Sequence, residues 1–343
     1  MLKVKGYQQG DENNILALFN KIFGEKRSND YWLWENMENP RGESIIALLK
    51  DSDDKIRGHL CLHVSLFKVG EQYLAAGQRI NSMLDREFRQ KGNFARMYDY
   101  IYQNSRERGI SFMFGFPNKQ ALGALNKITD IKDLGEIPRY VKFYDGSKAA
   151  KHFFSNRFIV LITGFALQGL EKLGRKKVVK DSRVFEVKAF DSRFDRLWFE
   201  ASKSLDIATV RDSVYLNWRY TNSPRNYKIW ACEEKDGHIS GYLVLFCEDD
   251  MGHIIDLLAL DYKNVIPALL GRADEYCSNR CHTLSCWCLD QGQVSTVLKN
   301  HGFLRIKSHN KIVFNSVDCT TEQENLLKNS GNWYITMGDS DYK

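Results

Sequence analysis

The stretch Arg89-Gln90-Lys91-Gly92-Asn93-Phe94-Ala95 decides the fold prediction for this 343-residue chain. It follows an extended apolar run from Ala75 to Leu84 and opens a helical pattern that continues to about Arg108. The N–H groups of a helix's first turn have no partner within the helix, and the helix dipole adds partial positive charge there. A strand, a basic glycine turn and a helix N-terminus together predict an anion site that holds a pyrophosphate. The alternative is an ordinary strand-to-helix connection that binds no ligand.

The turn resembles the R/Q-x-x-G-x-G/A segment with which GCN5-related N-acetyltransferases (GNAT proteins) hold acetyl-CoA. Phe94 stands where the family usually has Gly or Ala, which leaves room for a shifted phosphate position or a different acyl-CoA. In the family, backbone groups near the end of the preceding strand also contact the pantetheine arm. The resemblance therefore implies these acetyl-CoA-binding residues: Met83, Leu84, Arg89, Gln90, Lys91, Gly92, Asn93, Phe94 and Ala95.

Composition and charge exclude several classes of protein. Hydrophobic residues make up 43% of the chain and charged residues 27%, which is an ordinary globular balance. The net charge of +6 suits an anionic ligand, but 43 acidic residues are mixed among the basic ones, so no nucleic-acid partner is expected. The most apolar run, residues 158–167, is too short to span a bilayer. Eight cysteines and no signal-peptide pattern predict reduced thiols in the cytoplasm.

Four of the cysteines cluster near one histidine, which raises the question of a zinc site. They are Cys277, Cys281, Cys286 and Cys288, with His282 among them. However, no C-x-x-C pair occurs, and Cys286 and Cys288 lie in a strand-like run. The sequence favours buried free cysteines, and no metal site is predicted.

A Y-x-x-W-x5-P pattern occurs twice, from Tyr31 to Pro40 and from Tyr215 to Pro224. The flanking segments repeat the same order of expected strands and helices, as two copies of one fold would. We therefore predict an α+β protein of two tandem GNAT-like domains, each with a mixed, mostly antiparallel sheet flanked by helices. The predicted boundaries are residues 1–146 for the domain with the acyl-CoA site, 147–182 for a helical linker, and 183–343 for a degenerate GNAT-like domain.

The two copies differ at the turn. Where the first copy has its basic glycine turn, the second has Asp261-Tyr262-Lys263-Asn264-Val265, with no glycine. This difference predicts one CoA site, in the first copy, and a second copy that forms one wall of the acceptor cleft. The alternative is that the second copy has a purely structural role. Sequence order assigns the strand Tyr140–Tyr144 to the first sheet, and Phe303–Lys307 and Lys311–Asn315 to the second.

The predicted linker contains an apolar stretch followed by the basic run Gly174-Arg175-Lys176-Lys177. This pattern favours a helix that packs between the domains, with basic residues at its C-terminal end. Peripheral contact with an anionic membrane through residues 157–180 is the alternative.

The family resemblance implies direct attack of an amine on the thioester, with main-chain N–H groups at Met83 and Leu84 as oxyanion donors. Leu125 occupies the position where the family often has a tyrosine that acts as the acid for the leaving thiolate. We take Leu84, Asn118 and His63 as the catalytic candidates, and Asn118 also fits a helix N-cap. The general base is left open, and the further candidates are His59, Gln78, Asn81, Ser82 and Asp85.

The fuller chain resembles a bacterial tandem-GNAT group through three segments: Gly115-Phe116-Pro117-Asn118, Asn217-Trp218-Arg219-Tyr220 and Gly338-Asp339-Ser340-Asp341. Many members of that group are associated with surface-polysaccharide assembly. The resemblance implies transfer of an acetyl group from acetyl-CoA to a small-molecule amine, such as an amino sugar or nucleotide-linked sugar. Asp339 and Asp341 are expected either to contact the amine or to lie in a solvated tail.

Two other functions stay open: aminoacyl transfer to a cell-wall precursor, and non-catalytic binding on a degenerate GNAT fold. The sequence does not specify the acceptor, the acyl chain length or the oligomeric state.

Overall fold

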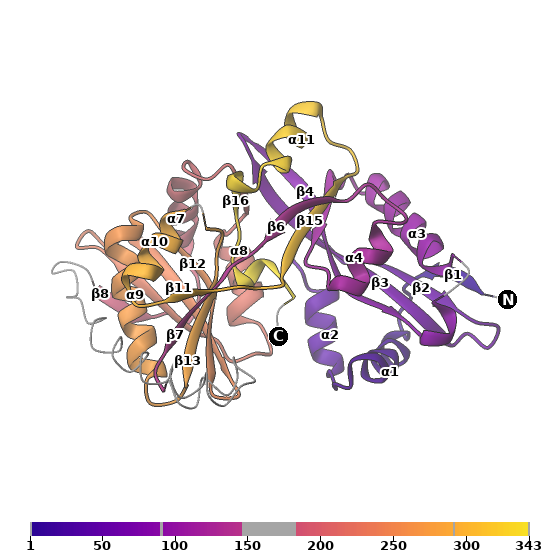
Figure 1. The fold of residues 1–343 in the computed structure, drawn as a ribbon, viewed down its shortest axis with the longest axis horizontal. Coiled ribbons are helices and arrows are strands. Elements are labelled where there is room, and N and C mark those ends of the chain that lie inside the picture. Colours follow the sequence, from indigo (N-terminus) through magenta and orange to yellow (C-terminus); the bar gives the residue numbers. More distant parts are fainter. Residues whose placement is uncertain (1, 90–91, 146–182, 291, 342–343) are drawn as a thin grey trace.

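The computed structural model describes residues 2–89, 92–145, 183–290 and 292–341. Two mixed sheets, each flanked by helices, stand side by side (Figure 1), which confirms the α+β prediction. The first sheet has the strand order β1-β2-β3-β4-β5-β15-β6, and the second has the order β14-β7-β13-β12-β11-β10-β8. Both are mainly antiparallel; the parallel pairs are β4 with β5 and β9 with β16 in the first sheet, and β12 with β13 in the second.

The N-terminal part of the chain builds most of the first sheet and its helices. Its strands are β1 (Lys3–Gly6), β2 (Ile45–Lys50), β3 (Ile56–Val69), β4 (Gln72–Leu84), β5 (Phe112–Gly115) and β6 (Lys132–Glu136). Its helices are α1 (Glu12–Phe23), α2 (Asn29–Asn36), the short η1 (Arg86–Phe88), α3 (Asn93–Glu107) and α4 (Lys119–Leu125). Helix α3 is amphipathic and buries Met97, Tyr98 and Ile101, as its helical spacing of apolar residues requires.

The C-terminal part repeats this order. Its strands are β8 (Arg183–Glu186), β9 (Ile207–Thr209), β10 (Lys228–Glu233), β11 (Ile239–Glu248), β12 (Met251–Ala259), β13 (Thr283–Trp287), β14 (Leu304–Ile306), β15 (Lys311–Ser316) and β16 (Trp333–Tyr334), preceded by β7 (Arg139–Phe143). Its helices are α7 (Ser192–Ser202), α8 (Ser213–Leu216), the π-turn η3 (Asn217–Thr221), α9 (Tyr262–Cys277), α10 (Gln293–Asn300), α11 (Thr321–Lys328), η4 (Ser330–Asn332) and η5 (Met337–Asp339).

Strands cross between the two halves in both directions, and β9 and β16 of the C-terminal half also join the first sheet, where β9 pairs with β3. Strand β7 pairs with β13 and β14 in the second sheet, and β15 pairs with β5 and β6 in the first. Figure 1 shows the magenta β7 among orange strands and the gold β15 beside purple ones. The sheet assignments expected for Tyr140–Tyr144 and Lys311–Asn315 are therefore wrong, although the strands themselves are present. The predicted domain boundary at residue 146 does not separate the two sheets, because each sheet contains strands from both sides of that boundary.

The connection from β6 to β7 gives the physical reason for the first exchange. Only Ile137 and Pro138 stand between these strands. Ile137 is fully buried, and its N–H donates to Asn310 O at 2.8 Å. Proline fixes its own backbone and favours an extended residue before it, whereas a tight hairpin requires residues with positive φ. The chain therefore continues into the neighbouring sheet instead of turning back.

The repeat found in the sequence is a direct contact between the halves. Trp34 on α2 stacks on Trp218 in η3, with ring centroids 5.4 Å apart. Trp34 Nε1 donates to Trp218 O at 2.9 Å, and Trp218 Nε1 donates to Trp34 O at 3.1 Å. The helix starts also match, because Ser28 and Asp212 cap α2 and α8 in the same way. The two copies thus meet through equivalent residues, as in a two-fold symmetric interface.

We predict strong coupling between the two tryptophans. Each of Trp34→Phe and Trp218→Phe removes one indole N–H and leaves a buried carbonyl without its donor, which costs about 1–3 kcal/mol of unfolding free energy. Because the rings also touch, the double variant should deviate from additivity by about 0.5–3 kcal/mol in urea denaturation. The matched control combines Trp34→Phe with Trp230→Phe, which lies in the C-terminal core against Tyr276. Additive effects in both pairs would contradict the coupling.

Candidate active site

The basic glycine turn has the backbone that an anion site needs. Gly92 is the N-cap of α3 and has φ 71° and ψ 9°, a left-handed conformation that glycine adopts without strain. A Cβ at Gly92 would meet nothing within 4 Å, so the space in front of the helix start is open. Arg96 N–H donates to Gly92 O at 3.0 Å, so the hydrogen-bonding pattern of α3 begins at Gly92. The predicted strand and helix are present, and Gly92 lies where the turn meets the helix; Gln90 and Lys91 lie outside the described residues.

The other residues of the turn differ in how far their side chains are buried. Asn93 is buried, and its side-chain amide donates to Phe88 O at 3.0 Å. Phe94 is partly buried and packs against the apolar cluster that includes Met97 and Ile101. Ala95 is half-buried on the first turn. Arg89 is exposed, and its Nε donates to Leu84 O at 3.1 Å.

At the corresponding helix start in the C-terminal half, a carboxylate of the protein itself occupies the place of a bound anion. The side chain of Asp261 accepts from Lys263 N at 2.9 Å and from Asn264 N at 3.1 Å at the start of α9. A carboxylate therefore satisfies the amides that a phosphate would need. This favours a single phosphate site, at Gly92.

The central strands separate next to this turn. The ladder between β4 and β5 runs from Ala76–Phe112 to Arg79–Gly115 and then stops, while β4 continues to Leu84. A cavity of about 180 Å³ opens at the separation. Its lining includes Arg79, Ile80, Asn81, Ser82, Gly115, Phe116, Pro117, Asn118 and Leu125. Asn118 also accepts from Ala121 N at 2.9 Å, so it caps α4 and lines the cavity at once.

The ladder distinguishes the two predicted oxyanion donors. Asp85 N donates to Arg57 O at 2.8 Å, and the register pairs Met83 with His59 and Leu84 with Gly58. Because hydrogen-bonded and non-hydrogen-bonded pairs alternate along an antiparallel ladder, the backbone of Met83 faces β3 and that of Leu84 faces the opposite side. The Met83 side chain is also buried. Of the two, Leu84 N–H keeps the orientation required of a donor to a ligand.

Arg79, at the point of separation, was not anticipated from the sequence. Its Nε, Nη1 and Nη2 are closed off from solvent and make no hydrogen bond within the described part of the chain. Burial lowers the pKa of Arg79, and the Tyr98 hydroxyl acts in the opposite direction. An uncompensated buried charge costs free energy, so this guanidinium is suited to an incoming acceptor oxygen.

A second, tighter cavity lies at the seam between the halves and has room of about 30 Å³, enough for a water-sized polar group such as an ammonium. Strands β3 and β4 contribute His63 and its cross-strand partner Gln78. The rest of the wall comes from both halves: Tyr31, Trp34, Glu35, Asn39, Val64, Ser65, Tyr215, Trp218, Arg219, Gly338, Ser340 and Asp341. Asp341 lines this cavity and the one at the strand separation, so the two cavities adjoin.

The seam cavity contains two polar groups ready for a ligand. His63 Nε2 and Gln78 Nε2 are buried and have no hydrogen-bond partner among the described residues. Burial lowers the pKa of His63 to about 4, so its ring is neutral near pH 7. Glu35 is held by Arg27 at 2.6 Å and by Asn81 Nδ2 at 3.2 Å.

Other candidates are engaged elsewhere. Asp85 pairs with Lys21 at 2.6 Å, and His59 Nδ1 lies 2.9 Å from Asn81 O. Asp339 is buried and accepts from Arg211 at 2.7 Å. The expectation that Asp339 either contacts the amine or lies in a solvated tail is therefore wrong, while Asp341 lies at the cavities.

Residues 3–122 match the model of the acetyltransferase (GNAT) domain family. No curated protein matches the chain. A probable N-acyltransferase from Enterococcus faecalis V583 superposes with a TM-score of 0.69 at 10% identity, over 93% of this chain and 73% of its own. A GCN5-related N-acetyltransferase from Anabaena variabilis gives 0.66 at 12% identity, over 92% and 73%. N-myristoyltransferase from Saccharomyces cerevisiae, solved with myristoyl-CoA, gives 0.59 at 11% identity, over 92% and 79%.

At these identities the structural likeness concerns the fold, and it covers both halves of the chain. The chain therefore has two tandem GNAT-like domains. The domain match and these neighbours support an N-acyltransferase. Among the described residues, every helix is too short or too polar to cross a bilayer.

We predict that Arg79→Met stabilises the ligand-free protein. Removal of a buried unpaired guanidinium should raise the unfolding free energy by about 1–3 kcal/mol in urea denaturation. The same change should weaken acyl-CoA binding about tenfold or more, since a hydrogen bond to a charged group is lost. Arg106→Met, exposed on α3, is the control and should change neither quantity. A destabilised Arg79→Met protein would contradict the assignment.

The buried histidines predict a loss of stability in acid. Burial lowers the pKa of His59, His63 and His253 to about 4 from 6.5. The unfolded chain therefore binds more protons between these values, so the stability from neutral rings is complete above pH 6.5 and is lost as the pH falls toward 4. Urea denaturation should show this fall, and His63→Gln should make it shallower. An unchanged slope in the variant would contradict the lowered pKa.

Proposed function

We propose that the protein transfers an acetyl group from acetyl-CoA to the amine of an amino sugar or nucleotide-linked sugar, within a cytoplasmic step of surface-polysaccharide synthesis. One observation carries the proposal. The cavity where β4 and β5 separate adjoins the seam cavity through Asp341. An acyl donor in the first cavity would meet an amine in the second.

The donor side uses main-chain groups. The open helix start at Gly92 would bind the pyrophosphate, assisted by Arg89. Residues Arg79 and Asn118 would hydrogen-bond the pantetheine arm in the separation, where β4 has an unpaired edge. Leu84 N–H would donate to the thioester oxygen as negative charge develops on it. The myristoyl-CoA bound by the yeast neighbour supports acyl-CoA use on this fold.

The acceptor side has the polarity for an amine. The Asp341 carboxylate would bind the ammonium form, and Gln78 would orient the substrate. Once the ammonium has lost one proton to solvent, the amine nitrogen attacks the carbonyl carbon and the C–S bond breaks. The second proton on nitrogen passes to the neutral His63 Nε2 and from there to the thiolate of CoA, which leaves as the free thiol. The stacked Trp34 and Trp218 line the seam cavity and would provide an apolar wall beside the amine.

The C-terminal half would act as the acceptor-side wall, because its own helix start is occupied by Asp261. A non-catalytic binding role is the second candidate. It is favoured by Leu125, an apolar residue in the cavity where a tyrosine acid would be expected. Aminoacyl transfer to a cell-wall precursor fits less well, because it does not require the phosphate turn.

A screen tests the activity directly. The reduced protein is incubated with acetyl-CoA or longer acyl-CoAs and a panel of amino sugars and nucleotide-linked amino sugars, and free thiol is measured. Amine-dependent thiol release with product of the expected mass supports the proposal. Acyl-CoA binding without release for any amine would support the binding role.

The phosphate placement predicts a charge effect at Gly92. Both Asn and Asp tolerate the left-handed backbone, so Gly92→Asn and Gly92→Asp differ only in charge at the turn. In calorimetry with CoA, Gly92→Asp should lose detectable binding, through repulsion of the phosphates, and Gly92→Asn should retain weakened binding. Gly271→Asp, at an open position on α9, controls for added charge elsewhere. Equal affinity of the two Gly92 variants would place the phosphates elsewhere.

A further inference from the structure

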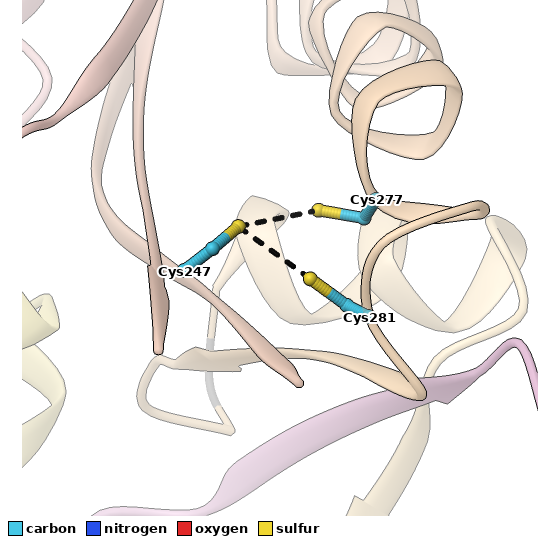
Figure 2. A group of neighbouring side chains, drawn as sticks. All are labelled: Cys247, Cys277 and Cys281. Carbon is cyan, nitrogen blue, oxygen red and sulfur yellow. Dashed lines mark hydrogen bonds between the residues drawn. The ribbon is translucent and has the colours of Figure 1, made fainter. Parts of the chain in front are cut away.

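Three cysteine side chains converge in the C-terminal half, away from both cavities of the active site. Cys247 lies on β11, Cys277 ends α9, and Cys281 follows in the turn that leads to β13. Figure 2 shows all three sulfur atoms pointing toward one point. The Cys247 sulfur lies 3.9 Å from that of Cys277 and 3.5 Å from that of Cys281, and all three lie within 4.8 Å of one another.

These separations fit a shared metal ion. A zinc–sulfur bond is about 2.3 Å long, so two sulfurs on one ion at tetrahedral or trigonal angles lie about 3.8–4.0 Å apart. The observed distances are close to this, and all eight cysteines are free of disulfides. Thiolates are soft ligands that favour Zn²⁺ and Cu⁺ over harder cations. Only small shifts of the three side chains are needed to bind such an ion.

We propose that Cys247, Cys277 and Cys281 bind one thiophilic d10 ion, Zn²⁺ or Cu⁺. Each thiol releases its proton to solvent as the metal–sulfur bond forms. A Cu⁺ ion is satisfied by three thiolates. For Zn²⁺, water can complete a tetrahedron, since Cys247 is partly exposed. This site differs from the set considered from sequence, because Cys286 and Cys288 lie outside the group and Cys247 supplies the third ligand.

The ion would fasten the part of the fold that receives the exchanged strand. His282, directly after Cys281, donates its N–H to Asp250 O at 2.6 Å, and its carbonyl accepts from Tyr144 N at 2.9 Å. Tyr144 follows β7 directly. A metal that joins β11, α9 and this turn would therefore stabilise the end of β7. Binding to the folded state alone would raise the melting temperature.

The test uses the full chain, reduced and purified without oxygen, and titrated in separate arms with Zn²⁺ and Cu⁺. Elemental analysis after removal of loose metal should give one ion per chain in at least one arm. Cys247→Ser and Cys281→Ser should lose it, and Cys319→Ser, a half-buried cysteine outside the group, should retain it. Circular dichroism checks that each variant is folded.

A second measurement does not depend on the variants. The bound ion should protect the partly exposed Cys247 from alkylation, as read by mass spectrometry, and removal with a chelator should restore its reactivity, while Cys319, which is also half-buried, reacts alike in both states. Absence of metal in both arms, full binding by the serine variants, or equal alkylation with and without metal would overturn the proposal.

Discussion

The reciprocal contact between Trp34 and Trp218 joins the two halves and lines the seam cavity between them. Each indole donates to the other's backbone carbonyl, and the rings stack. Strands β7 and β15 also hold the halves together, because each pairs along both of its edges with strands of the other half. One apolar core runs through both halves, from Phe67 and Phe112 to Tyr220 and Tyr242. The contact between the halves is therefore part of a continuous protein interior.

The two copies of the fold differ at their corresponding helix starts and in what they contribute to the seam cavity. The N-terminal copy keeps an open helix start after β4, while Asp261 closes the equivalent one after β12. The C-terminal copy instead contributes side chains and its C-terminal segment to the seam cavity. Arg219 donates to the carbonyls of Gly338 and Ser340 and so holds that segment in place. Asp341 follows directly and lies at the junction of the two cavities.

Local features of the fold were readable from the sequence, and long-range ones were not. The left-handed Gly92, the helix it opens and the capping Asn118 follow from short-range backbone chemistry. The internal repeat also predicted two similar domains. The partners of β7 and β15 depend on which sheet edge is nearer in space, which strand patterns do not encode. The Ile137-Pro138 connection was the one local sign that the chain would not turn back. The sequence did not indicate a role for Arg79 or Cys247, because the role inferred for each depends on its neighbours in space.

The unpaired groups around the two cavities point to a ligand more strongly than any motif does. In the described part of the chain, Arg79, His63 and Gln78 each hold buried nitrogen atoms that make no hydrogen bond, and each such group costs about 1–3 kcal/mol. Together these costs approach a large share of the 5–15 kcal/mol by which domains are typically stable. All three lie on β3 and β4 beside the two adjoining cavities. A structural role would have supplied acceptors from the protein, as it does for Arg211. Their absence at the seam is best explained if the substrates supply them.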